Sequence, residues 1–263
     1  MASVIDKNRT ETIQLPGAEV RLVRKGKGAP MLLLHGGGGP VAQLPFANRL
    51  AERFEIFAPV HPGFGGTRIP AHFDGLPDLI YLYLDLLDAL DLKNAVVVGM
   101  SLGGWLAAEL ATISCARFSK LVLVDAVGVK HGGPTEREIA DVFGMPDVEA
   151  LKLMWHDPAK APDLSKLDEA TIETIAGNRI ALALYGWEPW LHNPKLKYRI
   201  HRIKLPTLVL WGESDRLVKP DYGRKYAALI PGAKFVSIAG AGHAPQIEQP
   251  DAFVKQVLDF AGS

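Results

Sequence analysis

Three residues of this sequence, Ser101, Asp215 and His243, could together perform nucleophilic catalysis. Ser101 is the centre of a Gly-x-Ser-x-Gly segment, residues 99–103, which follows an apolar run and precedes a stretch with good helix propensity. A sharp strand-to-helix turn at such a segment exposes the serine hydroxyl, and it needs glycine on both sides because side chains there would collide. The segment therefore predicts a nucleophilic serine.

The other two residues lie in loops that follow later apolar runs. Asp215 ends the segment 211–215, and His243 lies in a glycine-containing loop, residues 240–245. An imidazole between a carboxylate and a serine can remove the hydroxyl proton while the carboxylate fixes the ring tautomer. We predict a triad of these three residues. Asp125 remains the alternative acid, because it too follows a strand run and could reach the histidine.

A glycine-rich segment, residues 35–40, begins where an early apolar run ends. Backbone N–H groups without neighbouring side chains can approach a reacting carbonyl closely and stabilise the negative charge that develops on its oxygen. The first N–H groups of the helix after the serine carry a partial positive charge, so they also stabilise negative charge on this oxygen. We expect the N–H groups of Gly37 and Leu102 to form an oxyanion hole.

Short runs rich in leucine and valine alternate with helical stretches along most of the chain. Runs that are apolar on both faces are typical of a parallel sheet covered by helices on both sides. We expect a hairpin over residues 10–26. Strands are predicted at residues 30–34, 56–60, 95–98, 121–124, 207–211 and 235–238, and helices at 44–53, 77–90, 102–113, 221–229 and 252–260.

Residues 131–203 interrupt this alternation, because helical pieces at 136–143 and 171–185 occur there without a good strand run. We predict an inserted helical cap at 131–203 between two parts of one core, residues 1–130 and 204–263.

Aromatic side chains in this cap could line an apolar pocket. The candidates for substrate binding are Trp155, Trp187 and Arg179, the last for a substrate carboxylate. Packing of the tryptophans between cap and core, and simple exposure of the arginine, are the alternatives.

Composition narrows the classes of function. Of 263 residues 48% are apolar and 22% charged, which is the balance of a globular protein. Lysine plus arginine equals aspartate plus glutamate, 29 each, so no net field favours a nucleic acid, and a small-molecule substrate is expected. The six histidines outside the His35 segment and the triad show no metal-ligand spacing, so no metal is predicted. The oligomeric state does not follow from the sequence.

The single cysteine, Cys115, cannot form an intrachain disulfide and is interpreted as a small core residue. No run approaches the roughly 18 apolar residues of a membrane span, so none is predicted. The first residues lack the apolar stretch of a secretory signal, and a cytoplasmic protein is the expectation.

The sequence resembles the α/β-hydrolase family over nearly the whole chain except the cap. The resemblance rests on the Gly-x-Ser-x-Gly segment, the His35 segment, His61-Pro62-Gly63-Phe64-Gly65 and the loops of Asp215 and His243, in the family's order. It implies an eight-stranded, mostly parallel sheet flanked by helices, no cofactor, and attack of serine on a carbonyl carbon. Many members have aspartate where this chain has His61, and we interpret the change as an adjustment of a structural turn.

Two reaction types fit this resemblance. The favoured one is hydrolysis of small to medium, largely apolar carboxylic esters through an acyl-enzyme. The alternative is carbon–carbon bond hydrolysis of the meta-cleavage-product type, which splits vinylogous diketones from aromatic-ring breakdown. The His35 segment resembles that group, although it lacks the usual Gly-Pro-Gly continuation. A catalytically silent, ligand-binding member of the fold is disfavoured, because all three triad residues are present.

Overall fold

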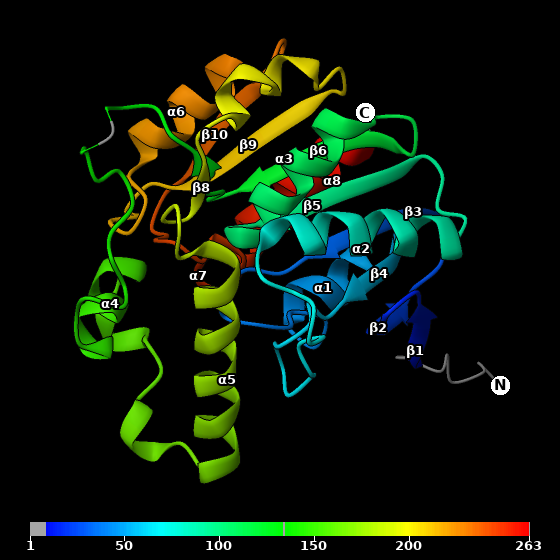
Figure 1. The fold of residues 1–263 in the computed structure, drawn as a ribbon. Coiled ribbons are helices and arrows are strands. Elements are labelled where there is room, and N and C mark those ends of the chain that lie inside the picture. Colours follow the sequence, from blue (N-terminus) through cyan, green and yellow to red (C-terminus); the bar gives the residue numbers. More distant parts are fainter. Residues whose placement is uncertain (1–8, 134, 263) are drawn as a thin grey trace, which may run out of the picture.

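Eight strands form one sheet in the computed structural model, which describes residues 9–133 and 135–262 (Figure 1). The sheet order is β1-β2-β4-β3-β5-β6-β9-β10, and only the β1–β2 and β2–β4 pairs are antiparallel. The strands are β1 (Arg9–Leu15), β2 (Ala18–Lys25), β3 (Ala29–Leu34), β4 (Phe54–Pro59), β5 (Ala95–Met100), β6 (Phe118–Val124), β9 (Thr207–Gly212) and β10 (Lys234–Ile238). The predicted fold class is confirmed.

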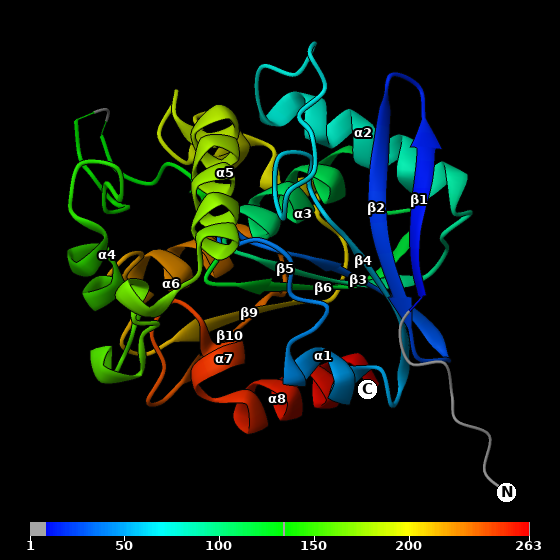
Figure 2. The same ribbon diagram turned by 90° about the horizontal axis from the view of Figure 1, so that it is seen from below.

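Helices cover both faces of this sheet (Figure 2). Successive side chains along a strand point alternately into two apolar cores, one on each face. In β3, Leu32 and Leu34 face one core, while Met31 and Leu33 face the other, as the period of two along a strand requires. Cys115 is half-buried and packs against the first core, so it lies at the margin of the core instead of inside it. The helices over the first core are α2 (Leu76–Ala89), α3 (Leu102–Ile113) and α6 (Pro220–Leu229), and those over the second are α1 (Pro45–Leu50) and α8 (Pro250–Gly262).

The parallel strands end at one edge, and this alignment positions the candidate site. Leu34 pairs with Gly99, and Val124 pairs with both Met100 and Leu210. The segments that leave these strands therefore meet above the same edge, which is where open α/β sheets bind their ligands.

The segment between β6 and β9 differs in part from the prediction. Helix α5 (Glu169–Gly186) matches the predicted helix, and the Asp168 side chain caps it by accepting from the Thr171 N–H. Residues 136–143 are not helical, which corrects the prediction. There Ile139 pairs with Val218 in an isolated bridge, so the backbone is used for contact with the segment after β9 instead of for a helix.

The structure adds elements to this segment that the sequence did not predict. Helix α4 (Asp147–Met154) precedes α5, and the short strands β7 (Gly128–Val129) and β8 (His192–Asn193) pair in parallel. Helices α4 and α5 lie outside the layers of sheet and covering helices (Figure 1). This arrangement supports the cap, whose boundaries at residues 131 and 203 remain a proposal. None of the helices in the described part of the chain is long and apolar enough to cross a membrane.

A close backbone contact holds the loop that carries His243, residues 240–245, against the sheet. This loop is called the histidine loop below. A Cβ atom added to Gly212 at the end of β9 would lie 1.8 Å from the carbonyl oxygen of Gly242. A Cβ on Gly242 would in turn lie 2.1 Å from the carbonyl oxygen of Met154, at the end of α4. Three backbone segments therefore stack without a side chain between them.

We expect Gly212→Ala to lower the free energy of unfolding by about 2 kcal/mol or more, because overpacking against backbone cannot be relieved by a rotamer change. Urea denaturation measures the loss. Gly38→Ala is the matched control, since a Cβ there meets nothing within 4 Å. Equal stability of the two variants would contradict this role of the contact.

Candidate active site

Ser101, His243 and Asp215 form a continuous hydrogen-bonded line. The Ser101 hydroxyl donates to Nε2 of His243 over 3.0 Å, and Nδ1 of His243 donates to Oδ2 of Asp215 over 2.7 Å. Oδ1 of Asp215 accepts from the N–H groups of Leu217 and Val218. Both the histidine and the aspartate side chains are buried. This chain of donors and acceptors assigns the Nδ1–H tautomer to His243, which leaves Nε2 free to accept the serine proton.

The turn at Ser101 has the strained geometry that the glycines permit. Ser101 has φ 50° and ψ −112°, a conformation that non-glycine residues rarely adopt and that clusters at functional sites. Its N–H donates to the carbonyl of Val124, which fixes the turn on β6. A Cβ on Gly99 would lie 2.4 Å from the Gly103 carbonyl oxygen, and one on Gly103 would lie 2.3 Å from that of Leu34. Only glycine fits at both positions.

The glycine-rich segment after β3 lies directly against the serine. A Cβ on Gly36 would be 3.0 Å from Cβ of Ser101, so the backbone there approaches the hydroxyl closely. The N–H groups of Gly37 and Leu102 have no acceptor within residues 9–133 and 135–262. Leu102 is the first residue of α3, where N–H groups lack a partner inside the helix. Both predicted donors are thus without a partner among the described residues, Leu102 directly after the serine in the chain and Gly37 directly after Gly36, whose backbone approaches the serine.

Two buried histidines, His35 and His61, form hydrogen bonds that hold the glycine-rich segment 35–40 in place. Nε2 of His35 accepts from the His61 N–H, while Nε2 of His61 donates to the His35 carbonyl and its Nδ1 accepts from the Tyr83 hydroxyl. Nδ1 of His35 is left to donate to the Gly36 carbonyl, within the glycine-rich segment 35–40. The imidazole of His61 therefore has more than the turn role that the sequence suggested.

These hydrogen bonds fit two neutral imidazoles. Burial lowers the pKa of His61 to about 4. Burial, with the neighbouring His61, lowers the pKa of His35 well below its usual range. Burial likewise raises the pKa of Tyr83 far above its usual value, so its hydroxyl keeps the proton that it donates. No sequence pattern singles out Tyr83, which occupies one of the apolar positions of α2.

The end of α4 contacts two loops of the site, the one that carries His243 and the one that carries Asp215. The His243 N–H donates to the Met154 carbonyl, and Nδ1 of His156 lies 2.7 Å from the Ser214 hydroxyl. Glu248 connects the segment after α4 to the histidine loop, because its carboxylate accepts from the N–H groups of His156 and Gly242. None of these contacts was predicted, since each joins segments that are far apart in the sequence.

The predicted cap residues lie in different places. Trp155 is half-buried at the end of α4, beside the histidine loop, and its carbonyl accepts from Arg216. Arg179 of α5 pairs with Asp147 of α4, and its guanidinium also stacks on the Phe143 ring. These contacts leave Arg179 engaged with the protein itself.

Trp187 is 55% exposed, and the structure does not bring it to the triad. It belongs to an aromatic cluster with Phe143 and Trp190. It also lines a cavity of about 870 Å³ between the segments 129–141 and 187–198, whose lining does not include the triad.

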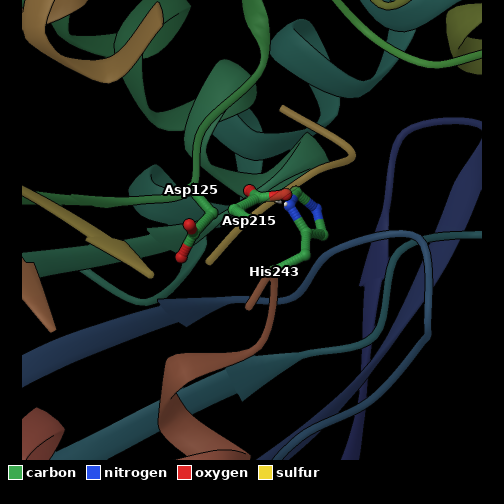
Figure 3. Close-up of side chains that lie close together, drawn as sticks. All are labelled: Asp125, Asp215 and His243. Atoms are coloured by element: carbon green, nitrogen blue, oxygen red, sulfur yellow. Dashed lines mark hydrogen bonds and ion pairs between the residues drawn. The ribbon is translucent and has the colours of Figure 1, made fainter. Parts of the chain in front are cut away.

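Asp125 lies beside the triad without joining the line. One oxygen of Asp125, one of Asp215 and one ring nitrogen of His243 are within 4.8 Å of one another (Figure 3). In the described part of the chain this is the one group of three potential metal ligands so close together. Its histidine and one of its carboxylates are already bonded to each other, so we assign no metal to it.

Comparisons with known proteins agree on the fold. The family described as "Alpha/beta hydrolase family" matches residues 31–256. The chain is 29% identical over 271 aligned positions to a 2-hydroxy-6-oxononadienedioate/2-hydroxy-6-oxononatrienedioate hydrolase of Paraburkholderia phymatum, covering 94% of this chain and 92% of that protein. It is 27% identical to a 2-hydroxy-6-oxo-2,4-heptadienoate hydrolase of Pseudomonas putida, covering 93% of each.

Solved structures show the same likeness. A meta-cleavage product hydrolase from Pseudomonas fluorescens matches with a TM-score of 0.77 at 24% identity, covering 96% of this chain and 97% of that one. A naproxen esterase from Bacillus subtilis also matches with a TM-score of 0.77, at 18% identity, covering 97% and 92%. At these identities the structural matches show the shared fold.

The histidine pair predicts a loss of stability in acid. Between pH about 6.5 and 4 an unfolded chain protonates residue 61 while the folded chain does not, so the free energy of unfolding falls as the pH falls. His61 alone accounts for about 3 kcal/mol over this range, and His35 acts in the same direction. Urea denaturation at a series of pH values measures the slope.

His61→Asn is the control, because its amide oxygen can still accept from Tyr83 but does not titrate in this range. We expect a shallower slope in this variant. The same slope in both proteins would show that His61 is not the neutral, buried group described above.

Proposed function

Because the chain belongs to the alpha/beta hydrolase family, we propose that it is a serine-dependent hydrolase with Ser101, His243 and Asp215 as catalytic residues. The observation that carries the proposal is the buried, hydrogen-bonded line from the serine hydroxyl to the aspartate. In this proposal the boundaries of core and cap stand as predicted, and the substrate enters between them.

Each residue has a defined role in the proposed reaction. His243 takes the hydroxyl proton as Ser101 attacks the carbonyl carbon, and Asp215 stabilises the imidazolium that forms. The N–H groups of Gly37 and Leu102 bind the oxyanion. His243 then gives its proton to the leaving group, and water hydrolyses the acyl-enzyme by the same steps.

We propose a substrate of the meta-cleavage-product type, a 2-hydroxy-6-oxo-dienoate, in which the bond between the C6 carbonyl and C5 is cleaved. The substrate first tautomerises, its 2-hydroxyl proton moving to C5, so that the electron pair of the C5–C6 bond can pass to the C2 oxygen, which takes up a proton. Hydroxide from water ends on the C6 acyl carbon. The support comes from relatives that cover more than nine tenths of this chain and are named as hydrolases of such compounds. Ester hydrolysis, the reaction that the sequence favoured, uses the same residues and serves as the comparison reaction.

Arg179 is the proposed group for the substrate carboxylate. Its present partner, Asp147, is 47% exposed, so an ion pair at this position is weak and a substrate carboxylate can replace it. A guanidinium binds a carboxylate through two parallel hydrogen bonds, which would orient the substrate. Trp155, beside the histidine loop, is the aromatic residue proposed to contact the substrate, whereas Trp187 lines a separate cavity.

The proposed triad can be tested by substitution. Ser101→Ala and His243→Ala should remain folded and lose turnover by about 10⁴-fold or more. Asp215→Asn should lose about 10⁴-fold, because Oδ1 must still accept two N–H groups and the amide nitrogen then faces His243, which forces the wrong tautomer. Loss of the dienoate absorbance measures turnover, with chromogenic esters assayed in parallel. Full activity of Asp215→Asn would transfer the acid role to Asp125.

The two assays distinguish the reaction types. Rapid loss of the dienoate absorbance with slow ester turnover supports carbon–carbon cleavage. Fast ester turnover with an inert dienoate would return the assignment to the esterase, and inactivity on both would overturn both substrate classes.

A further pair of variants separates substrate binding by Arg179 from its pairing with α4. Arg179→Gln should raise KM for the dienoate at least tenfold, while Asp147→Asn, which frees the guanidinium, should leave KM unchanged or lower it. Urea denaturation controls for the ion pair, which both variants remove. A similar stability loss in both variants with no change in KM would assign Arg179 a structural role only.

A further inference from the structure

Asp125 has no role in the proposed mechanism, although it is buried beside the triad in a strained backbone conformation. It follows β6 with a φ of 42°, in the left-handed region, and only 1% of its surface is exposed. Oδ1 accepts from the N–H of Gly212, at the end of β9. Oδ2 is buried, and no residue of the described ranges 9–133 and 135–262 bonds to it.

The surroundings of Asp125 are negatively charged. Asp215 and His243 lie within 4.8 Å of it, and Glu248 of α7 (Pro245–Glu248) also acts on it electrostatically (Figure 3). A buried carboxylate needs donors for both of its oxygens, and here one oxygen has none. A buried carboxylic acid needs an acceptor for its proton, and the neighbouring Asp215 carboxylate is one.

Two carboxylates this close in a buried site cannot both carry a charge. Asp215 has three hydrogen-bond donors, the Leu217 and Val218 N–H groups and Nδ1 of His243, whereas Asp125 has one. The charge therefore belongs on Asp215 and the proton on Asp125. Burial, followed by the charge of Asp215, raises the pKa of Asp125 well above its usual range.

We propose that Asp125 is a neutral carboxylic acid that shares its proton with ionised Asp215 and so positions the acid of the triad. This inference rests on the proposed function of Ser101, His243 and Asp215. Asp125 is a positioning residue, because it acts through Asp215 and through its bond to Gly212. A single negative charge, that of Asp215, then faces His243.

Two variants test this role without straining the backbone, because asparagine and glycine both tolerate a positive φ. Asp125→Asn keeps a neutral group that can donate to Asp215 and accept from Gly212. We expect its kcat/KM to stay within about threefold of the wild type and the acid limb of its pH profile to be unmoved. Asp125→Gly removes both bonds, and we expect kcat to fall about tenfold or more with KM unchanged.

The pH profile of kcat/KM distinguishes protonated from ionised Asp125. If Asp125 were ionised, Asp125→Asn would remove a charge within 4.8 Å of His243 and shift the acid limb downward by about one to three pH units. Such a shift would overturn the proposal. Equal kcat for the asparagine and glycine variants would overturn the positioning role.

Infrared spectroscopy tests the proton directly and needs no turnover. In protein with isotope-labelled aspartate, a carbonyl stretch of a protonated carboxylic acid should be present at neutral pH in the wild type and in Ser101→Ala, and absent in Asp125→Asn. An unchanged spectrum in Asp125→Asn would overturn the inference. A wild type that turns over neither substrate would overturn the proposed function and leave this spectroscopic result standing.

Discussion

The candidate site depends on the close stacking of three backbone segments, the end of β9, the histidine loop and the end of α4. His243 reaches Ser101 because Gly212 and Gly242 have no side chains to hold the loop away from the sheet. The same stacking brings the His243 N–H to the Met154 carbonyl, so the imidazole is fixed from both sides. The hydrogen bonds of the triad are thus a consequence of backbone packing, because the backbone sets where the side chains can point.

The charges of the site follow from this packing. Burial makes every unpaired charge costly, and the buried histidines and tyrosine below the glycine-rich segment 35–40 have partners that suit their neutral forms. His35 and His61 bond as neutral imidazoles, and Tyr83 donates as a neutral phenol. In the proposed arrangement Asp215 is the one ionised group in direct contact with His243. A lone charge in a buried site acts strongly on its neighbour, which is the condition that a general base needs.

The sequence predicted what local pattern determines and missed what distant contacts determine. The glycine spacing around Ser101 predicts the strained turn, because only glycine fits beside it. The apolar runs likewise predict the sheet, because burial on both faces leaves few polar choices. Residues 136–143 were predicted to be helical and are not, because the pairing of Ile139 with Val218 competes with local propensity. The support of the histidine loop by Glu248 has no local signal at all.

The triad alone does not select between an ester and a diketone. Both reactions need a serine nucleophile, a base and an oxyanion hole, but carbon–carbon cleavage must release a carbon that can hold negative charge until it is protonated. In the proposed substrate the proton of the 2-hydroxyl must first move to C5, which gives the 2-oxo tautomer, and the electron pair of the broken C5–C6 bond then delocalises onto the C2 carbonyl oxygen. The protein has to hold the chain beside His243 in a conformation that permits this overlap. The groups that can do this belong to the predicted cap. The end of α4 contacts the loops of both His243 and Asp215, so a substrate that displaces Asp147 from Arg179 acts on a helix in direct contact with the catalytic loops. Recognition of the carboxylate and alignment of the base are therefore coupled through α4 in the proposed mechanism.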